Sequence, residues 1–421
     1  MEQLEQLVEL LEQLEQLGKL VTRRQAPSLL VLQPTSYCNL DCSYCYLQHR
    51  DDRARMSDAT LSAIGRNIIA PCPPDERPLV VWHGGEPMTL PVAWYEHAFA
   101  LLERESGGLP LRHAFQTNAV GVNRSWTDLW RKWKVNIGVS LDGPADLHDS
   151  RRRTRRGTGS HALVMRGVSR LQKAGLPFHV ISVLTAQSLS RADDIYDFFT
   201  GQGIRNVAFN VEEEEGQEGG SSLLATSQVA EGYTSFLKQF LRRCAADPVP
   251  FQCREIEGVK GLLATPHDQR SDNWQVDPFR IVTVGVQGGL STFSPELIGA
   301  AAPDYDDFVF GNVRDGGVQI MQESEAFRRA ASGIAEGVAA CAADCRFFEV
   351  CGGGAPANKY FELGRFDGTE TLHCKLTRQI TLETVLDALD AGVFDQPSQG
   401  GFLHDRSGSA ERHAGTESGR R

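Results

Sequence analysis

Three cysteines stand close together near the start of the chain, at Cys38, Cys42 and Cys45. Their spacing, CxxxCxxC, places three thiolates just beyond an apolar run over residues 29–33. A cubane iron–sulfur cluster held by three protein thiolates keeps one iron open for an outside ligand. The alternatives are three unrelated thiols or a zinc site, although zinc normally takes a fourth Cys or His at matching spacing. The spacing therefore predicts a reactive iron–sulfur cluster.

Polar and glycine-rich turns follow the next apolar runs along the chain. Gly84 and Gly85 precede Glu86 and Pro87, and glycines let the backbone approach a ligand closely. Backbone and carboxylate oxygens of this turn are acceptors for an ammonium group. Further polar positions come later, at Thr117-Asn118, at Ser140-Leu141-Asp142-Gly143 and in the arginine-rich run over residues 151–156. A Gly-Gly turn alone is a weak signal, so the order of these segments matters more than any one of them.

The elements that must position these residues alternate between two periodicities. Short apolar runs predict six strands, over residues 29–33, 79–82, 113–117, 135–141, 179–184 and 206–211. Segments of helical periodicity lie between them, over residues 57–70, 92–104, 126–133, 161–174 and 190–201. Such alternation is typical of βα units around a parallel sheet. We expect an α/β fold with a partial (β/α)6 barrel, whose working face is formed by the carboxyl ends of its strands.

The cysteine spacing, the aromatic Tyr44 and the order of the downstream turns resemble the radical S-adenosylmethionine (SAM) superfamily. The resemblance implies that Cys38, Cys42 and Cys45 hold a catalytic 4Fe-4S cluster that cleaves SAM reductively to a 5′-deoxyadenosyl radical. It further implies that the turn with Gly84, Gly85 and Glu86 binds the SAM ammonium group. Asn118 is expected to face the same pocket. Ser140 and Arg152 are expected to hold the SAM carboxylate, the arginine through its bidentate fork, although neighbouring arginines and a solvated basic loop are alternatives.

A second group of cysteines near the C-terminus resembles the SPASM extension of radical SAM enzymes that modify peptides and proteins. It consists of Cys341, Cys345, Cys351 and Cys374. Full SPASM modules bind two auxiliary clusters, but here Ala355 stands where a further cysteine is often found, and upstream only Cys253 is available. Four thiolates make one complete set, so we predict a single auxiliary 4Fe-4S cluster without an open iron, for electron transfer or structure. Structural zinc is the alternative, and Cys72, Cys244 and Cys253 are expected to be small buried apolar residues.

Longer segments resemble the cyclophane-forming SPASM peptide maturases, most closely the branch that serves glycine-rich-repeat precursor peptides (GrrM/OscB-like). These segments are LQPTSYC at 32–38, VWHGGEP at 81–87, FNVEE at 209–213, CGGGAPANKY at 351–360, FELGRFD at 361–367 and TETLHC at 369–374. The resemblance covers about residues 27 to 380. It implies a ribosomally made precursor peptide in which an aromatic ring carbon is joined to the β-carbon of a residue two positions later. It also implies an electron donor such as flavodoxin or ferredoxin.

Three other functions stay open at this point. A thioether-forming peptide maturase differs mainly in substrate, and a formylglycine-generating sulfatase maturase has the same architecture but is expected to use two auxiliary clusters. A zinc-binding adaptor without catalysis would leave the first three cysteines without a purpose. No motif indicates the deprotonating base; Glu212 and Glu213, after the sixth expected strand, are candidates, although an acidic run is usually a solvated loop or a peptide contact.

Composition excludes several classes of protein. The 43 Lys and Arg residues against 54 Asp and Glu give a net charge of −11, which disfavours nonspecific binding to nucleic acid or to an anionic membrane. No apolar run reaches eighteen residues, and no signal peptide is evident. We therefore expect a cytoplasmic protein whose ten cysteines are ligands or buried thiols rather than disulfides.

Five segments are expected along the chain. A Glu-Gln-Leu repeat predicts an amphipathic N-terminal helix that docks on its own domain or contacts a dimer partner or peptide. The polar C-terminal tail is expected to be disordered. The expected bounds are 1–26 for this helix, 27–225 for the barrel, 226–274 for a helical bridge, 275–392 for the SPASM-like module with its closing helix, and 393–421 for the tail.

Overall fold

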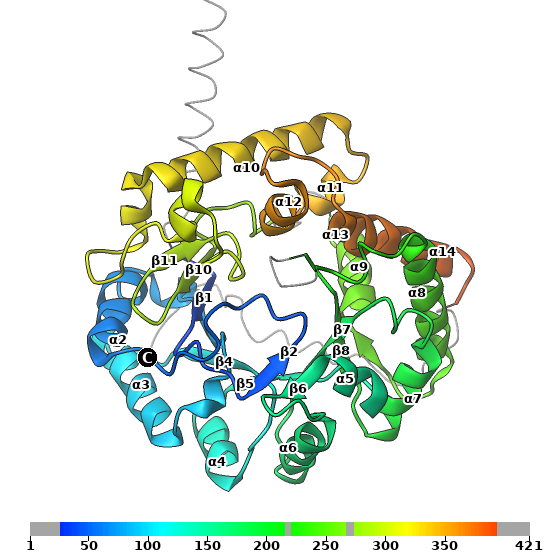
Figure 1. Cartoon of the computed structure of the whole chain (residues 1–421), viewed down its shortest axis with the longest axis horizontal. Helices are drawn as coiled ribbons and strands as arrows, with labels where there is room; N and C mark the ends of the chain where they lie inside the picture. The colour runs from blue at the N-terminus through cyan, green and yellow to red at the C-terminus, as the bar shows by residue number, and fades with distance from the viewer. Residues whose placement is uncertain (1–25, 215–219, 267–272, 394–421) are drawn as a thin grey trace, which may run out of the picture.

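The fold is built on one large sheet whose neighbouring strands are mostly parallel (Figure 1). A computed structural model describes residues 26–214, 220–266 and 273–393, so the predicted N-terminal helix and nearly all of the predicted tail lie outside the described residues. All six predicted strands are confirmed, with ends shifted by one residue at most. They are β1 (Leu29–Leu32), β3 (Leu79–Trp82), β4 (Arg112–Thr117), β5 (Asn136–Ser140), β7 (His179–Leu184) and β8 (Asn206–Val211).

The sheet continues beyond both ends of the predicted barrel. β9 (Gln252–Cys253) adds in parallel to β8, and β10 (Ile281–Val284) adds in parallel to β1 with Leu30 opposite Val282. β11 (Leu290–Thr292) then pairs antiparallel with β10. The bridge and the C-terminal module thus share the sheet of the barrel instead of forming separate bodies. Because every residue of β10 is buried, this junction belongs to the core.

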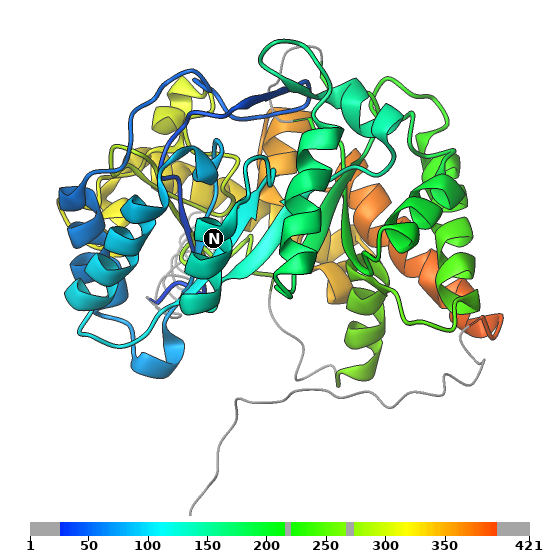
Figure 2. The same ribbon diagram turned by 90° about the horizontal axis from the view of Figure 1, so that it is seen from below.

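Helices pack outside the strands, as the alternating pattern predicted (Figures 1 and 2). They are α2 (Asp58–Ile64), α3 (Val92–Glu105), α4 (Arg124–Lys132), α6 (His161–Lys173), α7 (Ala192–Gly201), α8 (Val229–Ala246) and α9 (Arg254–Ala264). Ser57 caps α2 by accepting a hydrogen bond from the backbone N–H of Thr60. The predicted 57–70 helix runs on as a π-helical turn over Gly65–Ile69. Among the described residues, no helix is long and apolar enough to cross a membrane.

The C-terminal module contains more helix than the sequence indicated. Five helices close the ring between β11 and α8 (Figure 1). They are α10 (Glu325–Asp344), α11 (Phe348–Cys351), α12 (Pro356–Leu363), α13 (Leu372–Cys374) and α14 (Thr381–Asp390). Only the closing helix of this module was predicted, because most residues on the buried face of α10 are small and carry little apolar signal. A side chain at Gly337 would lie 2.2 Å from the carbonyl oxygen of Phe366, so this helix needs glycine to pack closely.

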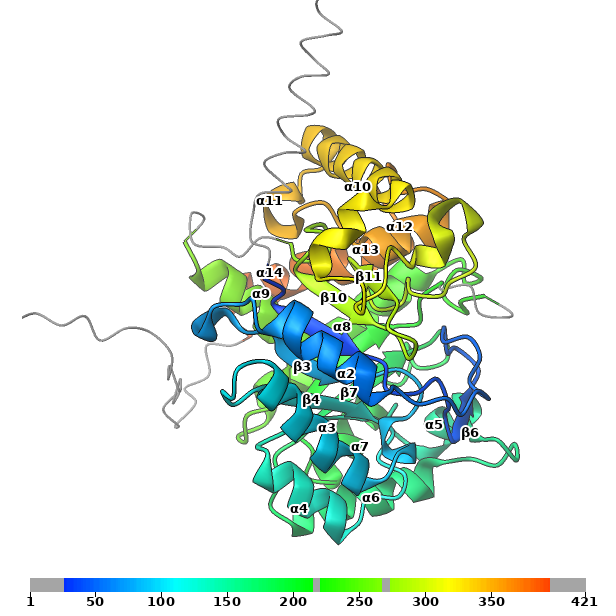
Figure 3. The same cartoon turned by 90° about the vertical axis from the view of Figure 1, so that its left-hand side faces the viewer.

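A small two-stranded sheet crosses one rim of the barrel. β2 (Leu40–Cys42) pairs antiparallel with β6 (Arg152–Thr154), and this register places Cys42 opposite Arg152. β6 directly follows α5 (Ala145–Arg151), a short helix that the sequence did not indicate. Figure 3 shows β6 and α5 together at the rim, well away from α10. This pairing ties the cysteine loop to the arginine-rich run, although the two are more than a hundred residues apart in sequence.

An aromatic cluster around Trp82 of β3 forms part of the core that supports the glycine turn. Trp82, the last residue of β3, is fully buried, and its ring lies edge-on to Tyr95 at 5.3 Å and tilted against Phe99 at 5.4 Å between centroids. Its indole N–H donates to Nδ1 of His113 at 3.3 Å. Burial lowers the pKa of His113 to about 3, so this ring is a neutral acceptor. The cluster fixes the end of β3 immediately before the Gly84–Gly85 turn.

Truncation of this cluster should destabilise the barrel. We expect Trp82→Ala to lower the free energy of unfolding by about 3–5 kcal/mol, because it removes a large buried ring and leaves a cavity. Trp274→Ala is the matched control, since Trp274 is 40% exposed and its loss should cost less than about 1 kcal/mol. Anaerobic urea unfolding measures both. Equal midpoints for the two variants would contradict the account of the core.

Candidate functional site

The three N-terminal cysteines lie on the loop that leaves the carboxyl end of β1, and all three are partly buried. Sγ of Cys38 accepts a hydrogen bond from the backbone N–H of Leu40 at 3.4 Å. Burial raises the pKa of Cys38 to about 12 and that of Cys42 to about 11, although the nearby charge of Arg152 lowers the latter. Thiols in such surroundings become thiolates when a metal replaces the proton. The loop therefore suits a buried metal cluster.

The Gly84–Gly85 turn lies directly against this loop. Both residues have positive φ, 89° and 57°, and a Cβ at Gly85 would lie only 2.5 Å from the carbonyl oxygen of Tyr37. That same oxygen accepts a hydrogen bond from the backbone N–H of Glu86 at 2.8 Å. Glycine is required here for both conformation and space. The structure thus brings together the first two segments that the sequence predicted for one site.

Glu86 is 2% exposed, and its carboxylate is used inside the chain. Oε1 accepts hydrogen bonds from Thr117 Oγ1 at 2.7 Å and from the backbone N–H of Met88 at 2.9 Å. Oε2 accepts one from the backbone N–H of Asn118 at 2.7 Å. Burial raises the pKa of Glu86 to about 7. The side chain joins the ends of β3 and β4, and its contact with the SAM ammonium group stays a prediction.

Asn118 and Ser140 lie on neighbouring strand ends. The side-chain amide of Asn118 donates to Oδ1 of Asn39 at 2.7 Å, within the cysteine loop. Ser140 Oγ accepts a hydrogen bond from the side chain of Gln116 at 2.9 Å. A Cβ at Gly138 would lie 2.2 Å from that glutamine's oxygen, so glycine makes room for it. Both predicted residues reach the site edge, and their contacts to SAM stay a prediction.

Arg152 forms an ion pair with a carboxylate for which no role was predicted. Its Nε and Nη2 bind Asp142 at 2.9 and 3.1 Å, and both side chains are buried. Asp142 also accepts hydrogen bonds from the hydroxyl of Tyr44 at 2.5 Å and from the backbone N–H of Val183 at 3.0 Å. Burial opposes ionisation, but the charge of Arg152 outweighs it with the other partners and lowers the pKa of Asp142. The predicted role of Arg152 toward the SAM carboxylate stays a prediction, with Nη1 as its remaining nitrogen.

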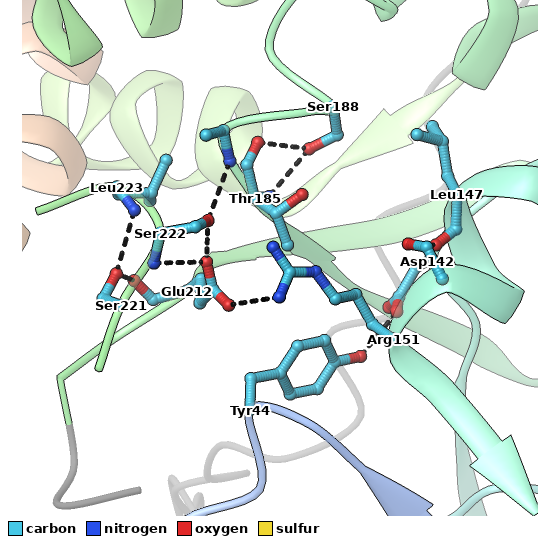
Figure 4. A network of polar contacts seen from close by, with 12 residues as sticks. Tyr44, Asp142, Leu147, Arg151, Thr185, Ser188, Glu212, Ser221, Ser222 and Leu223 are labelled. Carbon is cyan, nitrogen blue, oxygen red and sulfur yellow. Dashed lines mark hydrogen bonds and ion pairs between the residues drawn. The ribbon is translucent and has the colours of Figure 1, made fainter. Parts of the chain in front are cut away.

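The neighbouring Arg151 points into the barrel instead. Figure 4 shows its guanidinium extending past the ring of Tyr44 toward Glu212 at the end of β8. Nη1 lies 3.7 Å from Oε1 of Glu212, whose other oxygen accepts a hydrogen bond from the backbone N–H of Ser222 at 2.9 Å. Glu212 is 4% exposed and anchors the loop that follows β8. Both oxygens of Glu212 are thus engaged by groups of the chain itself.

The four C-terminal cysteines surround one cavity of about 300 Å³. Its lining includes Cys341, Cys345, Cys351 and Cys374 together. Burial raises the pKa of Cys374 to about 11. Gln379 donates to Sγ of Cys374 at 3.7 Å, and the buried Lys359 donates to Sγ of Cys341 at 3.5 Å. The structure therefore brings together the whole predicted set and adds two donors that the sequence analysis did not identify.

The number of cysteines in each set fits the predicted clusters. A structural zinc ion needs four ligand atoms within about 2.3 Å of one point. In the described part of the chain, no three His, Cys, Asp or Glu side chains are close enough together to hold one metal ion. A cubane cluster spreads its ligands over different irons. Three cysteines beside the glycine turn and four around one cavity match the open and the closed ligand sets of the predicted iron–sulfur groups, and the N–H donors at Cys38 and Cys341 favour the thiolate form.

Known proteins place this architecture in a family. The model of the radical SAM superfamily matches residues 32–199. An uncharacterized protein of Synechocystis sp. is 39% identical over 379 residues, which cover 89% of this chain and 94% of that protein. The chain belongs to the radical SAM superfamily. It is therefore an enzyme of a superfamily whose cofactors are a 4Fe-4S cluster and SAM.

More distant relatives of this radical SAM enzyme carry functional names. A serine-type anaerobic sulfatase-maturating enzyme of Bacteroides thetaiotaomicron is 24% identical over 355 residues, which cover 79% of this chain and 84% of that enzyme. The solved structure of native anSMEcpe with bound AdoMet and Cp18Cys peptide superposes with a TM-score of 0.69 at 19% identity, over 88% of this chain and 99% of that one. At this identity the likeness establishes the shared fold, and the predicted α/β radical SAM barrel is confirmed.

Lys359 should influence the reduction potential of the cluster that the four cysteines hold. Lys359 is 3% exposed, and its ammonium group contacts Cys341 Sγ and the carbonyl oxygen of Gly337. A buried positive charge stabilises the more negative, reduced state of a cluster. We expect Lys359→Met to shift the midpoint potential of the auxiliary cluster to more negative values and to leave the SAM-binding cluster unchanged, as measured by potentiometric EPR titration. Lys375→Met, a charge removal beside Cys374 on an exposed side chain, is the control, and equal shifts in the two variants would contradict this role.

Proposed function

We propose that this enzyme is a maturase of a ribosomally made precursor peptide and that it forms an aromatic-to-Cβ (cyclophane) crosslink. One observation carries the choice among maturases: a single complete set of four cysteines surrounds the C-terminal cavity. Of the remaining cysteines, Cys72 Sγ contacts the carbonyl oxygen of Ile68, and Cys253 Sγ contacts Glu255. Neither lines that cavity. One auxiliary cluster fits the resemblance to the cyclophane-forming family better than a sulfatase maturase with two.

The chain's own residues supply the framework for this chemistry. Bound SAM and its cluster would supply a 5′-deoxyadenosyl radical that removes a β-hydrogen from the peptide. Cys38, Cys42 and Cys45 would hold that cluster, with the Gly84–Gly85 turn against the SAM ammonium group. The peptide radical then adds to the aromatic ring, and loss of one electron and one proton restores aromaticity. The cluster proposed at the four-cysteine site would accept that electron.

Formylglycine formation is a second candidate, because the named relatives include sulfatase-maturating enzymes and a peptide-bound anSMEcpe has the same fold. It also removes two hydrogens when the target is serine, so intact mass alone does not separate it from a crosslink. A thioether product is distinguished by the cysteine that it consumes. A zinc adaptor without catalysis does not fit membership in this enzyme superfamily.

The decisive experiment is anaerobic co-expression with the short peptide encoded beside the gene, followed by mass spectrometry. We expect the peptide to lose about two hydrogens per ring, with backbone fragmentation suppressed between an aromatic residue and the residue two positions later. Hydroxylamine should add nothing to this product, because it contains no aldehyde. The Cys38→Ala, Cys42→Ala, Cys45→Ala triple variant should give unmodified peptide while retaining iron at the other cysteine set.

Other products would identify one of the alternative functions instead. A hydroxylamine adduct at a serine or cysteine would identify a formylglycine-type maturase. Loss of a free thiol without suppressed fragmentation around an aromatic residue would identify a thioether. A preparation that retains zinc and lacks iron at both cysteine sets would contradict radical chemistry altogether.

A further inference from the structure

A second cavity, of about 510 Å³, lies between the barrel and the C-terminal module. Residues after β8, along α9, and in α12 and α13 line it, together with the segment that follows β11. Its volume is in the range of sites that hold small ligands or peptide side chains. Arg378 lines both this cavity and the four-cysteine cavity, so the two share a wall.

Two carboxylates face this cavity from different parts of the chain. Glu213 follows β8 and accepts a hydrogen bond from the side chain of Asn358 at 2.6 Å. Its Oε1 also lies 3.6 Å from Nε2 of His373. Glu296 follows β11 and accepts a hydrogen bond from the hydroxyl of Ser294. The side chains that hold both acids in place come from the C-terminal module.

The electrostatic surroundings of Glu213 and Glu296 raise the pKa of both carboxyl groups. Burial raises the pKa of Glu296, the hydrogen bond from Ser294 opposes this, and the negative charge of Glu213 adds a smaller increase. Burial also raises the pKa of Glu213. His373 is neutral, since burial lowers its pKa to about 4. The other charged residues that line the cavity are Arg254, Glu255 and Arg378, and Arg254 is paired with Glu255 at 2.6 Å. Two carboxyl groups that face one cavity and repel each other's negative charge accept a proton more readily than a single solvated acid does.

We infer that this cavity receives the reacting segment of the peptide and that Glu296, with Glu213 beside it, accepts the proton that the crosslinked ring loses. The inference rests on the proposed function. In that step the ring C–H bond breaks, its proton passes to the carboxylate, and one electron leaves to an oxidised iron–sulfur centre. Glu296 acts as the base, and Glu213, which is held by a hydrogen bond from Asn358, faces the same cavity.

A peptide-binding measurement tests whether the peptide occupies the cavity, separately from the crosslinking chemistry. Gly258 lines the cavity from α9, and a Cβ there would meet nothing within 4 Å, so a large residue fits the helix and fills the cavity. We expect Gly258→Trp to weaken binding of the fluorescein-labelled precursor peptide to the iron-loaded enzyme at least about tenfold. Gly261→Trp is the matched control on the same helix, because its Cβ is equally free and it does not line the cavity. Unchanged binding by Gly258→Trp would overturn the placement of the peptide, whatever product the enzyme makes.

The proton step is tested by splitting radical formation from product formation. We expect Glu296→Gln to bind the peptide and form 5′-deoxyadenosine as the wild type does, yet to lose crosslinked product by about 10²-fold or more. Glu296→Asp should recover part of the product, and Glu257→Gln, an exposed acid on α9, should change nothing. Wild-type yield from Glu296→Gln, or joint loss of binding and 5′-deoxyadenosine, would overturn the role. Failure of the proposed function is distinct, because the wild type itself would then form no crosslink.

Discussion

Two buried carboxylates, Glu86 and Asp142, hold the candidate active site together. Each stands shortly after a strand of the barrel and accepts a hydrogen bond from another strand or its end, and Asp142 also accepts one from the cysteine loop. Glu86 joins the glycine turn to the end of β4, whereas Asp142 joins Tyr44 of the cysteine loop to Arg152. A buried carboxylate is tolerated only when its oxygens are fully partnered. The loop that carries the three cysteines is therefore tied to the barrel by contacts within the chain, through the hydroxyl of Tyr44 and the backbone carbonyl of Tyr37.

The sheet provides the second constraint, because it runs without a break from the barrel into the C-terminal module. β10 lies in parallel register with β1, the strand from which the cysteine loop leaves. A shift of the module would disturb that strand and the loop after it. The continuous sheet therefore holds the four-cysteine cavity and the larger cavity beside it at fixed positions relative to the barrel. Removal of an electron and a proton from one substrate would require such fixed positions.

Patterns with a strong local signal allowed most of the barrel to be predicted. The six apolar runs and the helices between them were found because parallel strands and their covering helices have distinct periodicities. The small sheet of β2 and β6 was not found, since three-residue strands carry no period. The helix α10 was missed because alanine and glycine replace larger apolar residues along its buried face.

Cysteine spacing likewise predicted which thiols would meet, and all four C-terminal cysteines do surround one cavity. Partners far apart in sequence could not be predicted in this way. Lys359 beside Cys341 lies within a motif that the sequence analysis quoted, but only the fold shows its burial. Glu296 had no sequence signal at all, because its meaning comes from the cavity that it shares with Glu213.

Hydrogen removal from the substrate β-carbon is the central claim, and isotope transfer tests it most directly. A precursor peptide carrying deuterium at the β-carbon of the residue two positions after each aromatic would be treated anaerobically with enzyme, SAM and reductant. The account predicts one deuterium in the recovered 5′-deoxyadenosine for each crosslink formed. Unlabelled 5′-deoxyadenosine, together with a modified peptide that keeps all of its deuterium, would contradict it.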